Sequence, residues 1–246
     1  KEKQEFVETQ KRKGIRIQDE CAYLNQFLRY VKNGTFKGLS NEKLRQIGKK
    51  LDFFPGIPDF FDRLNEIVKD NDDYRLNKLS LEFYIITTGI SEVVKGSKLS
   101  DYIVDVFGCE FVEDEQNQIS EIATVVTYTE KTKYLFAINK GVENVNAKFP
   151  KETRRIPFEN MIYIGDGPTD IPCFSVVKQY GGYCYAVYKQ GNPKCFKQTY
   201  RLNQEGRVHA FGPADYRAGS HTSKWIEETV KQIADRIVSD IEQYIR

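Results

Sequence analysis

The sequence from Met161 to Asp170 reads MIYIGDGPTD, and this stretch carries most of the information on the fold. Four residues suited to a buried strand run directly into a turn with two glycines and two carboxylates, Asp166 and Asp170. Carboxylates at one strand end repel each other unless a cation or a base lies between them. Since parallel α/β sheets bind ligands beyond the carboxyl ends of their strands, the stretch predicts a strand that ends at an Mg²⁺ site. The alternative is an ordinary Gly-Asp-Gly turn with solvated acids.

The sequence around this stretch alternates between strand and helix patterns. Short runs rich in β-forming residues, or alternating in polarity, predict strands at 83–86 and 182–188 and a hairpin formed by 109–114 and 120–128. Apolar residues at helical spacing predict helices between these strands and a long amphipathic helix from Trp225 onward. The alternation favours an α/β fold with a Rossmann-like parallel sheet flanked by helices.

Residues 1–50 differ from the rest of the chain. Leu24, Leu28 and Val31 fall at helical spacing, and the segment shows no convincing strand. Its apolar content is thin for an independent core, so we expect it to pack on another part of the protein. The division expected from this change of character is a small helical segment over residues 1–52 and an α/β core over residues 53–246.

The composition is that of a soluble, globular protein. Of the 246 residues, 40% are hydrophobic, and no apolar run approaches the ~20 residues that span a bilayer. The charged and polar start, Lys1–Gln4, shows no signal peptide, and five cysteines without a C-x-x-C pair indicate reduced thiols in a cytoplasmic protein. A net charge of +2, with both signs mixed, gives no reason to expect a nucleic acid or a membrane as partner. The sequence leaves the oligomeric state open.

Three elements, in this order, resemble the haloacid dehalogenase-like superfamily of phosphohydrolases, and more closely its phosphoserine-phosphatase-like branch. They are YIITTG at 84–89, a lysine at the start of the helix after the hairpin, and GDGPTD at 165–170. The resemblance implies that Thr87, Thr88 and Gly89 bind the phosphoryl group. It also implies that the superfamily's Rossmann-like core carries a small helical cap, here the segment 1–52.

The resemblance further implies a catalytic lysine and an Mg²⁺ site. Thr87 and Lys131 are the expected catalytic residues, and Lys131 also binds the phosphoryl group. Lys133 is a rival for this role, but Lys131 has the better register, with Leu135 four residues further along the helix. Asp166 is the expected direct metal ligand, and Asp170 is expected to support the metal or its waters.

The nucleophile motif of the superfamily, D-x-D-x-[TV] on the first and central strand, is absent from this sequence. In the superfamily the first aspartate forms an aspartyl phosphate, and the second is the general acid and base. Neither Asp72-Asp73, in a polar loop, nor Asp59 and Asp62, on a predicted helix, can replace them. The chain starts with Lys1, not Met, so we expect a longer product whose central strand and nucleophile lie upstream of residue 1.

The function expected from these features is that of an Mg²⁺-dependent phosphohydrolase that acts on a small phosphorylated molecule. Hydrolytic dehalogenation fits less well, because that chemistry needs no metal and leaves the acidic pair Asp166 and Asp170 unexplained. An alternative from another class is a catalytically silent binding or regulatory module that keeps the same fold. The coding sequence upstream of Lys1 would distinguish the phosphohydrolase from the silent module.

Overall fold

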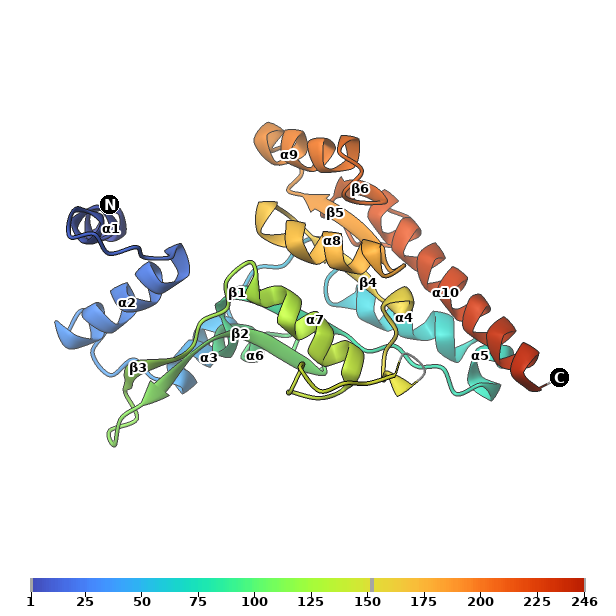
Figure 1. The fold of residues 1–246 in the computed structure, drawn as a ribbon, viewed down its shortest axis with the longest axis horizontal. Helices are drawn as coiled ribbons and strands as arrows, with labels where there is room; N and C mark the ends of the chain where they lie inside the picture. Colours follow the sequence, from blue (N-terminus) through green and yellow to red (C-terminus); the bar gives the residue numbers. More distant parts are fainter. Residues whose placement is uncertain (1, 151–152, 246) are drawn as a thin grey trace. The chain divides into compact units, whose positions relative to one another are not determined.

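The computed structural model describes residues 2–150 and 153–245 and has an α/β fold (Figure 1). The chain forms two compact units: the first comprises Lys1–Leu51 and Phe83–Glu130, and the second comprises Asp52–Glu82 and Lys131–Arg246. This partition differs from the expected division at residues 52 and 53, because Phe83–Glu130 groups with the N-terminal helices. Residues 1 and 246, the outer ends of the expected domains, lie outside the described residues.

The N-terminal part of the first unit is helical, as the apolar spacing predicts. It contains α1 (Glu2–Arg12), α2 (Asp19–Lys32) and α3 (Asn41–Gly48), and no strand is found among the described residues up to Leu51. Helix α2 packs against strand β3 (Ile119–Thr124) and buries four residues at helical spacing: Ala22, Leu24, Leu28 and Val31. The Ser40 side chain caps α3 by accepting a hydrogen bond from the backbone N–H of Lys43 (3.1 Å).

The first unit also holds a mixed three-stranded sheet of order β1-β2-β3. Strand β1 (Tyr84–Ile90) pairs in parallel with β2 (Asp105–Glu113), and β2 forms the predicted hairpin with β3. Helix α6 (Ser91–Lys95) follows β1 and packs on α3. Within residues 2–150 and 153–245, β1 pairs with β2 alone and lies at the edge of this sheet.

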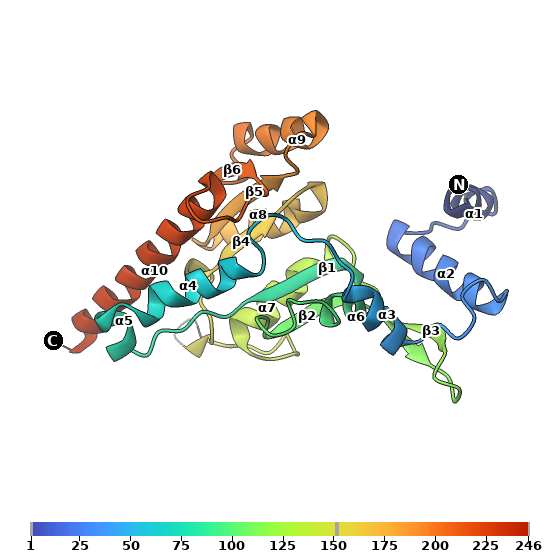
Figure 2. The ribbon, with the colours of Figure 1, turned by 180° about the vertical axis from the view of Figure 1, so that it is seen from behind.

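The second unit contains a parallel three-stranded sheet of order β4-β5-β6. Its strands are β4 (Ile162–Gly165), β5 (Tyr183–Tyr188) and β6 (Ala210–Pro213). Helix α8 (Ile171–Gln179) connects β4 to β5, and α9 (Pro193–Gln204) connects β5 to β6. These helical connections between parallel strands agree with the alternation of strands and helices predicted from the sequence. Figures 1 and 2 show α8, α9 and α10 (His221–Ile245) around this sheet. Among the described strands, β4 pairs with β5 alone and lies at the edge of the sheet.

The remaining elements of the second unit are mostly helical. They are α4 (Asp59–Lys69), α5 (Asp72–Leu76), α7 (Glu130–Lys140, whose first residue belongs to the first unit) and two 3₁₀ turns, η2 (Phe158–Asn160) and η3 (Pro168–Asp170). The long helix expected from Trp225 is α10, which packs on α4, α5 and β6. Helix α9 ends at Gln204, and β6 begins six residues later at Ala210. None of the described helices combines the length and the apolar content that crossing a membrane requires.

Candidate functional site

Strand β4 ends at the turn that the sequence singles out. Gly165 pairs with Ala186 of β5, and the chain then turns through Asp166 and Gly167 into η3 and α8. Gly165 is required by its surroundings, because a Cβ at this position would lie 2.7 Å from Cγ of Asp170. Its lack of a side chain therefore lets the Asp170 carboxylate fold back against the end of the strand.

Asp170 is a buried hub that organises the turn. Its Oδ1 accepts hydrogen bonds from the Lys131 ammonium (2.7 Å) and the Tyr163 hydroxyl (2.8 Å). Its Oδ2 accepts from the backbone N–H groups of Asp166 (3.1 Å) and Gly167 (3.3 Å). An ionised carboxylate has about four lone-pair sites. These four donors use the acceptor capacity of Asp170, so its carboxylate positions its neighbours and is not available to coordinate a metal directly.

Lys131 comes to this hub from the first turn of α7. It is 6% exposed, and it shares the buried side of the helix with Leu135 and Ile138, in the register expected from the sequence. The rival Lys133 is exposed, with its ammonium 5.5 Å from the centre of the Tyr134 ring. Asp170 takes one of the three donors of the Lys131 ammonium, which leaves two N–H groups for a bound anion.

Tyr163 was missed by sequence reasoning. It lies on β4 and donates its hydroxyl proton to Asp170. Burial, and then the negative charge of Asp170, raise the pKa of the Tyr163 phenol. The phenol therefore stays protonated and remains a donor. A tyrosine in an apolar strand is most simply a packing residue, so nothing in the pattern indicated this contact.

Asp166 differs from Asp170 in being exposed. No other described residue donates a hydrogen bond to its carboxylate. Loss of solvent around the carboxylate, and then the charge of Asp170, raise the pKa of Asp166, although Lys131 partly offsets this. A carboxylate that is destabilised by a nearby negative charge and has no donor of its own suits a cation.

The turn offers one carboxylate, that of Asp166, as a direct ligand for Mg²⁺. Within residues 2–150 and 153–245, no three His, Cys, Asp or Glu side chains gather where they could hold a metal ion. Mg²⁺, however, commonly keeps several waters and takes only one or two carboxylates. Asp166 can supply one such oxygen, whereas the hydrogen bonds of Asp170 prevent it from supplying a second.

The expected phosphate-binding segment, Thr87 to Gly89, lies in the first unit. Strand β1 does not stop at this segment, as the sequence suggested, but continues to Ile90 with a break in register between Ile86 and Ile90. In this bulge the Thr87 hydroxyl accepts a hydrogen bond from the Gly89 N–H (2.9 Å), so this amide is not free for a phosphate. The Thr87 hydroxyl keeps its own proton for donation to an anion.

A pocket of about 380 Å³ adjoins this bulge within the first unit. Its lining is largely apolar: Tyr23, Thr88, Gly89, Ile90, Val93 and Val94. The Tyr23 hydroxyl donates to the carbonyl oxygen of Thr88 (3.2 Å), and burial raises the pKa of this phenol. Sequence reasoning missed Tyr23, because a single tyrosine on an amphipathic helix gives no functional signal.

The expected site residues therefore fall into two groups. Lys131, Asp166 and Asp170 are brought together in the second unit, whereas Thr87, Thr88 and Gly89 belong to the first. The convergence of Thr87 with Asp166 in one cleft remains a prediction.

Other acids and both histidines are engaged elsewhere. Asp59 and Asp62 lie on α4, as expected. The polar loop expected at Asp72-Asp73 is wrong, because these residues open the short helix α5, which the Asn71 side chain caps. His209 accepts a hydrogen bond from the backbone N–H of Cys184 (2.9 Å), and His221 bonds to the Tyr185 hydroxyl (2.9 Å). These contacts agree with a structural role for both histidines.

Comparison with known proteins identifies a similar protein whose function is not described. No protein-family model matches the chain. The chain is 35% identical, over 232 residues, to an uncharacterized protein of Borreliella burgdorferi. The alignment covers 87% of this chain and 79% of that protein.

Proposed function

We propose that this chain, which belongs to the same family as the uncharacterized Borreliella burgdorferi protein, functions in an Mg²⁺-dependent phosphohydrolase of the haloacid dehalogenase-like superfamily. Its substrate is a small phosphorylated molecule, and the reaction passes through an aspartyl phosphate. The observation that carries this proposal is the buried ion pair of Lys131 with Asp170, beside the exposed carboxylate of Asp166 at the carboxyl end of β4.

In this proposal the residues of the second unit balance the negative charge of the phosphoryl group and of the carboxylates around it. Asp166 holds the Mg²⁺ ion, which when bound offsets the negative charge of the phosphoryl group and the carboxylates. Asp170 holds Lys131 and the backbone of the turn in place. The two remaining N–H groups of Lys131 bind the phosphoryl oxygens and the nucleophilic carboxylate.

In the first unit, the Thr87 hydroxyl donates a hydrogen bond to a phosphoryl oxygen. The adjoining pocket in the same unit, around Tyr23 and Val93, has no charged side chain in its lining.

The nucleophile is proposed to lie on a strand outside residues 1–246. Strand β4 has a free edge in its sheet, and a parallel strand added there would end beside the Asp166 turn. Such a strand would carry the two aspartates of the D-x-D motif to the candidate site. Five free thiols, at Cys21, Cys109, Cys173, Cys184 and Cys195, support a reducing location such as the cytoplasm.

The test compares two purified proteins in an assay with an aryl phosphate and Mg²⁺: residues 1–246, and the complete gene product. We expect turnover only from the complete product, with loss of activity when the metal is chelated. Robust Mg²⁺-dependent turnover by residues 1–246 alone would show that another aspartate is the nucleophile. A complete product that binds phosphate but turns over none would favour the second candidate, a silent binding or regulatory module.

A further inference from the structure

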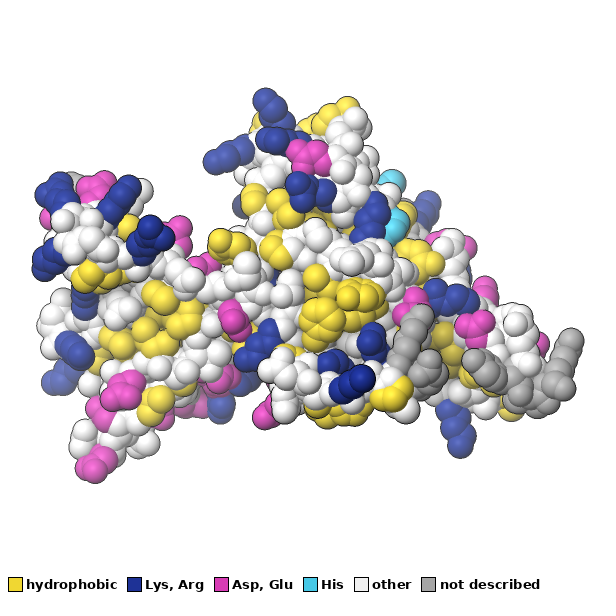
Figure 3. Space-filling model, viewed as in Figure 1, with side chains coloured by type: hydrophobic (Ala, Val, Ile, Leu, Met, Phe, Trp, Pro, Cys, Tyr) yellow, Lys and Arg dark blue, Asp and Glu magenta, His cyan; other side chains and the backbone are white. Residues whose placement is uncertain are grey.

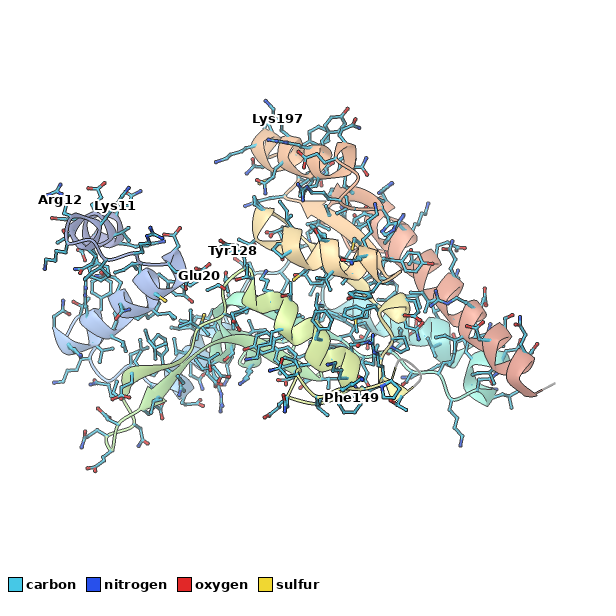
Figure 4. All side chains as sticks on the ribbon, viewed as in Figure 1. Lys11, Arg12, Glu20, Tyr128, Phe149 and Lys197 are labelled. Carbon is cyan, nitrogen blue, oxygen red and sulfur yellow. The ribbon has the colours of Figure 1, made fainter. Side chains whose placement is uncertain are left out.

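Helix α9 carries a concentration of positive charge that the whole-chain charge conceals. Residues 171–204 contain five Lys or Arg residues and no Asp or Glu, although the complete chain has a net charge of only +2. Three of the five are on α9: Lys194, Lys197 and Arg201. Figure 3 shows Lys and Arg side chains gathered over this helix, and Lys197 projects from it in Figure 4.

Two of the three cations on α9 form no ion pair with a described residue. Lys194 and Lys197 are exposed and form no ion pair with any described residue. Arg201, by contrast, pairs with Glu205 at 2.6 Å, and Glu205 also contacts Arg207. The two lysines, one turn apart on the helix, are therefore available to anionic groups of a partner.

Beside these lysines, α9 exposes two aromatic rings. Phe196 is 43% exposed and Tyr200 is 46% exposed, and their ring planes are only 20° apart with centroids at 6.0 Å. Phe196 packs edge-on against Tyr188 of β5, and both rings contact Phe211 of β6. The strands therefore hold the rings in a defined orientation before any partner binds.

Aromatic rings next to unpaired lysines match the chemistry of single-stranded nucleic acid. Its bases stack on flat rings, and its phosphates attract lysines. A membrane surface would need a broad apolar face on the helix. The face available on α9 is narrow, since Thr199 and Leu202 are buried and only the two rings project. An acidic peptide would use the lysines but would leave the rings exposed.

We propose that the α9 surface, formed by Lys194, Phe196, Lys197 and Tyr200, binds single-stranded nucleic acid. The two rings stack on bases, and the two lysines contact backbone phosphates. The surface borders the candidate site within the second unit, because a Cβ built on Gly167 would lie 3.0 Å from the side-chain nitrogen of Gln198 on α9. This proposal does not depend on the phosphohydrolase, since it concerns binding alone.

The test is fluorescence anisotropy of a labelled oligo(dT) of about 15 nucleotides, a length near the site size of single-strand binders. The titration uses the unmodified chain without Mg²⁺, at salt concentrations from about 50 mM to about 200 mM. We expect measurable binding at low salt. For the double variant Lys194→Gln/Lys197→Gln, the slope of log K against log salt should become shallower by about 1.4, since each phosphate contact contributes about 0.7.

A second variant separates stacking from charge. Phe196→Leu/Tyr200→Leu keeps apolar packing against β5 and β6 but removes the rings, and we expect about 10-fold weaker binding with an unchanged salt slope. Two matched controls should bind like the parent chain. Lys11→Gln/Lys13→Gln makes the same charge change at exposed positions of the first unit, and Phe54→Leu removes a ring that is also 43% exposed.

Three results would overturn the proposal. One is no binding of the oligonucleotide at the lowest salt. Another is equal weakening by the control pair Lys11→Gln/Lys13→Gln, which would show only diffuse charge attraction. The third is that substitutions at Phe196 and Lys197 weaken binding to phosphatidylserine vesicles but leave oligonucleotide binding unchanged. That result would assign the surface to a membrane. Circular dichroism checks that each variant is folded. If Phe196→Leu/Tyr200→Leu unfolds, the salt dependence of Lys194→Gln/Lys197→Gln alone tests the proposal, because both lysines are exposed.

Discussion

The ammonium of Lys131 lies 2.7 Å from Oδ1 of Asp170, and the two side chains are only 8% and 5% exposed. A buried pair of this kind gains little net stability, because removing both charges from water offsets much of their attraction. We infer that its main role is positional: it fixes a lysine beside the turn that carries Asp166.

The first prediction concerns the stability of this pair. Lys131→Met keeps the buried stem but leaves Asp170 as an uncompensated charge, so we expect a loss of about 3–5 kcal/mol in the free energy of unfolding. Adding Asp170→Asn removes that charge and should recover part of the loss. Urea unfolding of the two single variants and the double variant measures this coupling. Strictly additive losses would show that the two side chains do not interact in the folded protein.

The second prediction concerns Tyr163. Tyr163→Phe removes one of the four donors to Asp170 and leaves that carboxylate partly unsatisfied, which should cost about 1–3 kcal/mol. The Tyr163 hydroxyl supports the Asp170 carboxylate and is not placed against the substrate in this proposal, so turnover by the complete product should fall in kcat with little change in KM. Tyr180→Phe is the matched control, because that hydroxyl forms no hydrogen bond with any residue that the structure describes. A Tyr163→Phe variant as stable and as active as the parent would show that this hydrogen bond contributes to neither stability nor turnover.

The third prediction concerns pH and the first unit. Buried Glu92 of α6 accepts a hydrogen bond from Arg45 (2.5 Å), which links α3 to α6, and a second from Lys95 (3.0 Å) within α6. Burial by itself would raise the pKa of Glu92, but the hydrogen bonds from Lys95 and Arg45 outweigh it and lower the pKa from its usual 4.5. A carboxyl group whose pKa is lower in the folded protein than in the unfolded chain stabilises the fold at pH values above its unfolded-state pKa. This contribution is lost as the pH falls through the folded-state pKa.

Glu92→Gln should therefore lower the melting temperature at about pH 7, and the difference from the parent should shrink below about pH 4. Thermal unfolding at several pH values measures this. Glu42→Gln, at an exposed position in the first turn of α3, is the control for a general effect of charge on the helix. A difference that stays constant down to acidic pH would contradict the assignment of the shift to Glu92.

The fourth prediction concerns Thr87. If its hydroxyl binds a phosphoryl oxygen, Thr87→Val should lower kcat/KM of the complete product by about 10²-fold, the typical loss on removing one preorganised donor. Thr87→Ser keeps the hydroxyl and should retain most of the activity. Equal losses in both variants would point to packing of the Thr87 methyl group, which contacts the region of Gly108, as the cause.

The parts of the fold that the sequence predicted are those with strong local patterns. The Lys131 register follows from Leu135 and Ile138, and the β4 turn follows from an apolar run that meets a Gly-Asp-Gly sequence. Helix α9 was missed because it buries few apolar side chains, mainly Leu202, although Asn192-Pro193 at its start is a recognisable cap. Strand β6 is only four residues long and gives little periodicity.

The division of roles between the two carboxylates could not be predicted from the sequence. Asp166 and Asp170 look equivalent in a short motif, but only the folded turn directs four donors to Asp170 and leaves Asp166 exposed. The same limit applies to the partner of α9, since a net charge averages over the whole chain and conceals a local excess. Both features depend on contacts between distant residues.

The central claim is that Asp166 holds the metal of a phosphohydrolase. It is tested most directly by hydrolysis of p-nitrophenyl phosphate by the complete gene product, at increasing Mg²⁺ concentration, for the parent, Asp166→Asn and Asp240→Asn. Asp240 is the control, because it is an exposed carboxylate of the second unit on α10. We predict Mg²⁺-dependent turnover by the parent and by Asp240→Asn, and a loss of about 10²-fold or more for Asp166→Asn that added Mg²⁺ does not restore. Turnover by Asp166→Asn at the parent's rate and with the parent's Mg²⁺ dependence would contradict the claim.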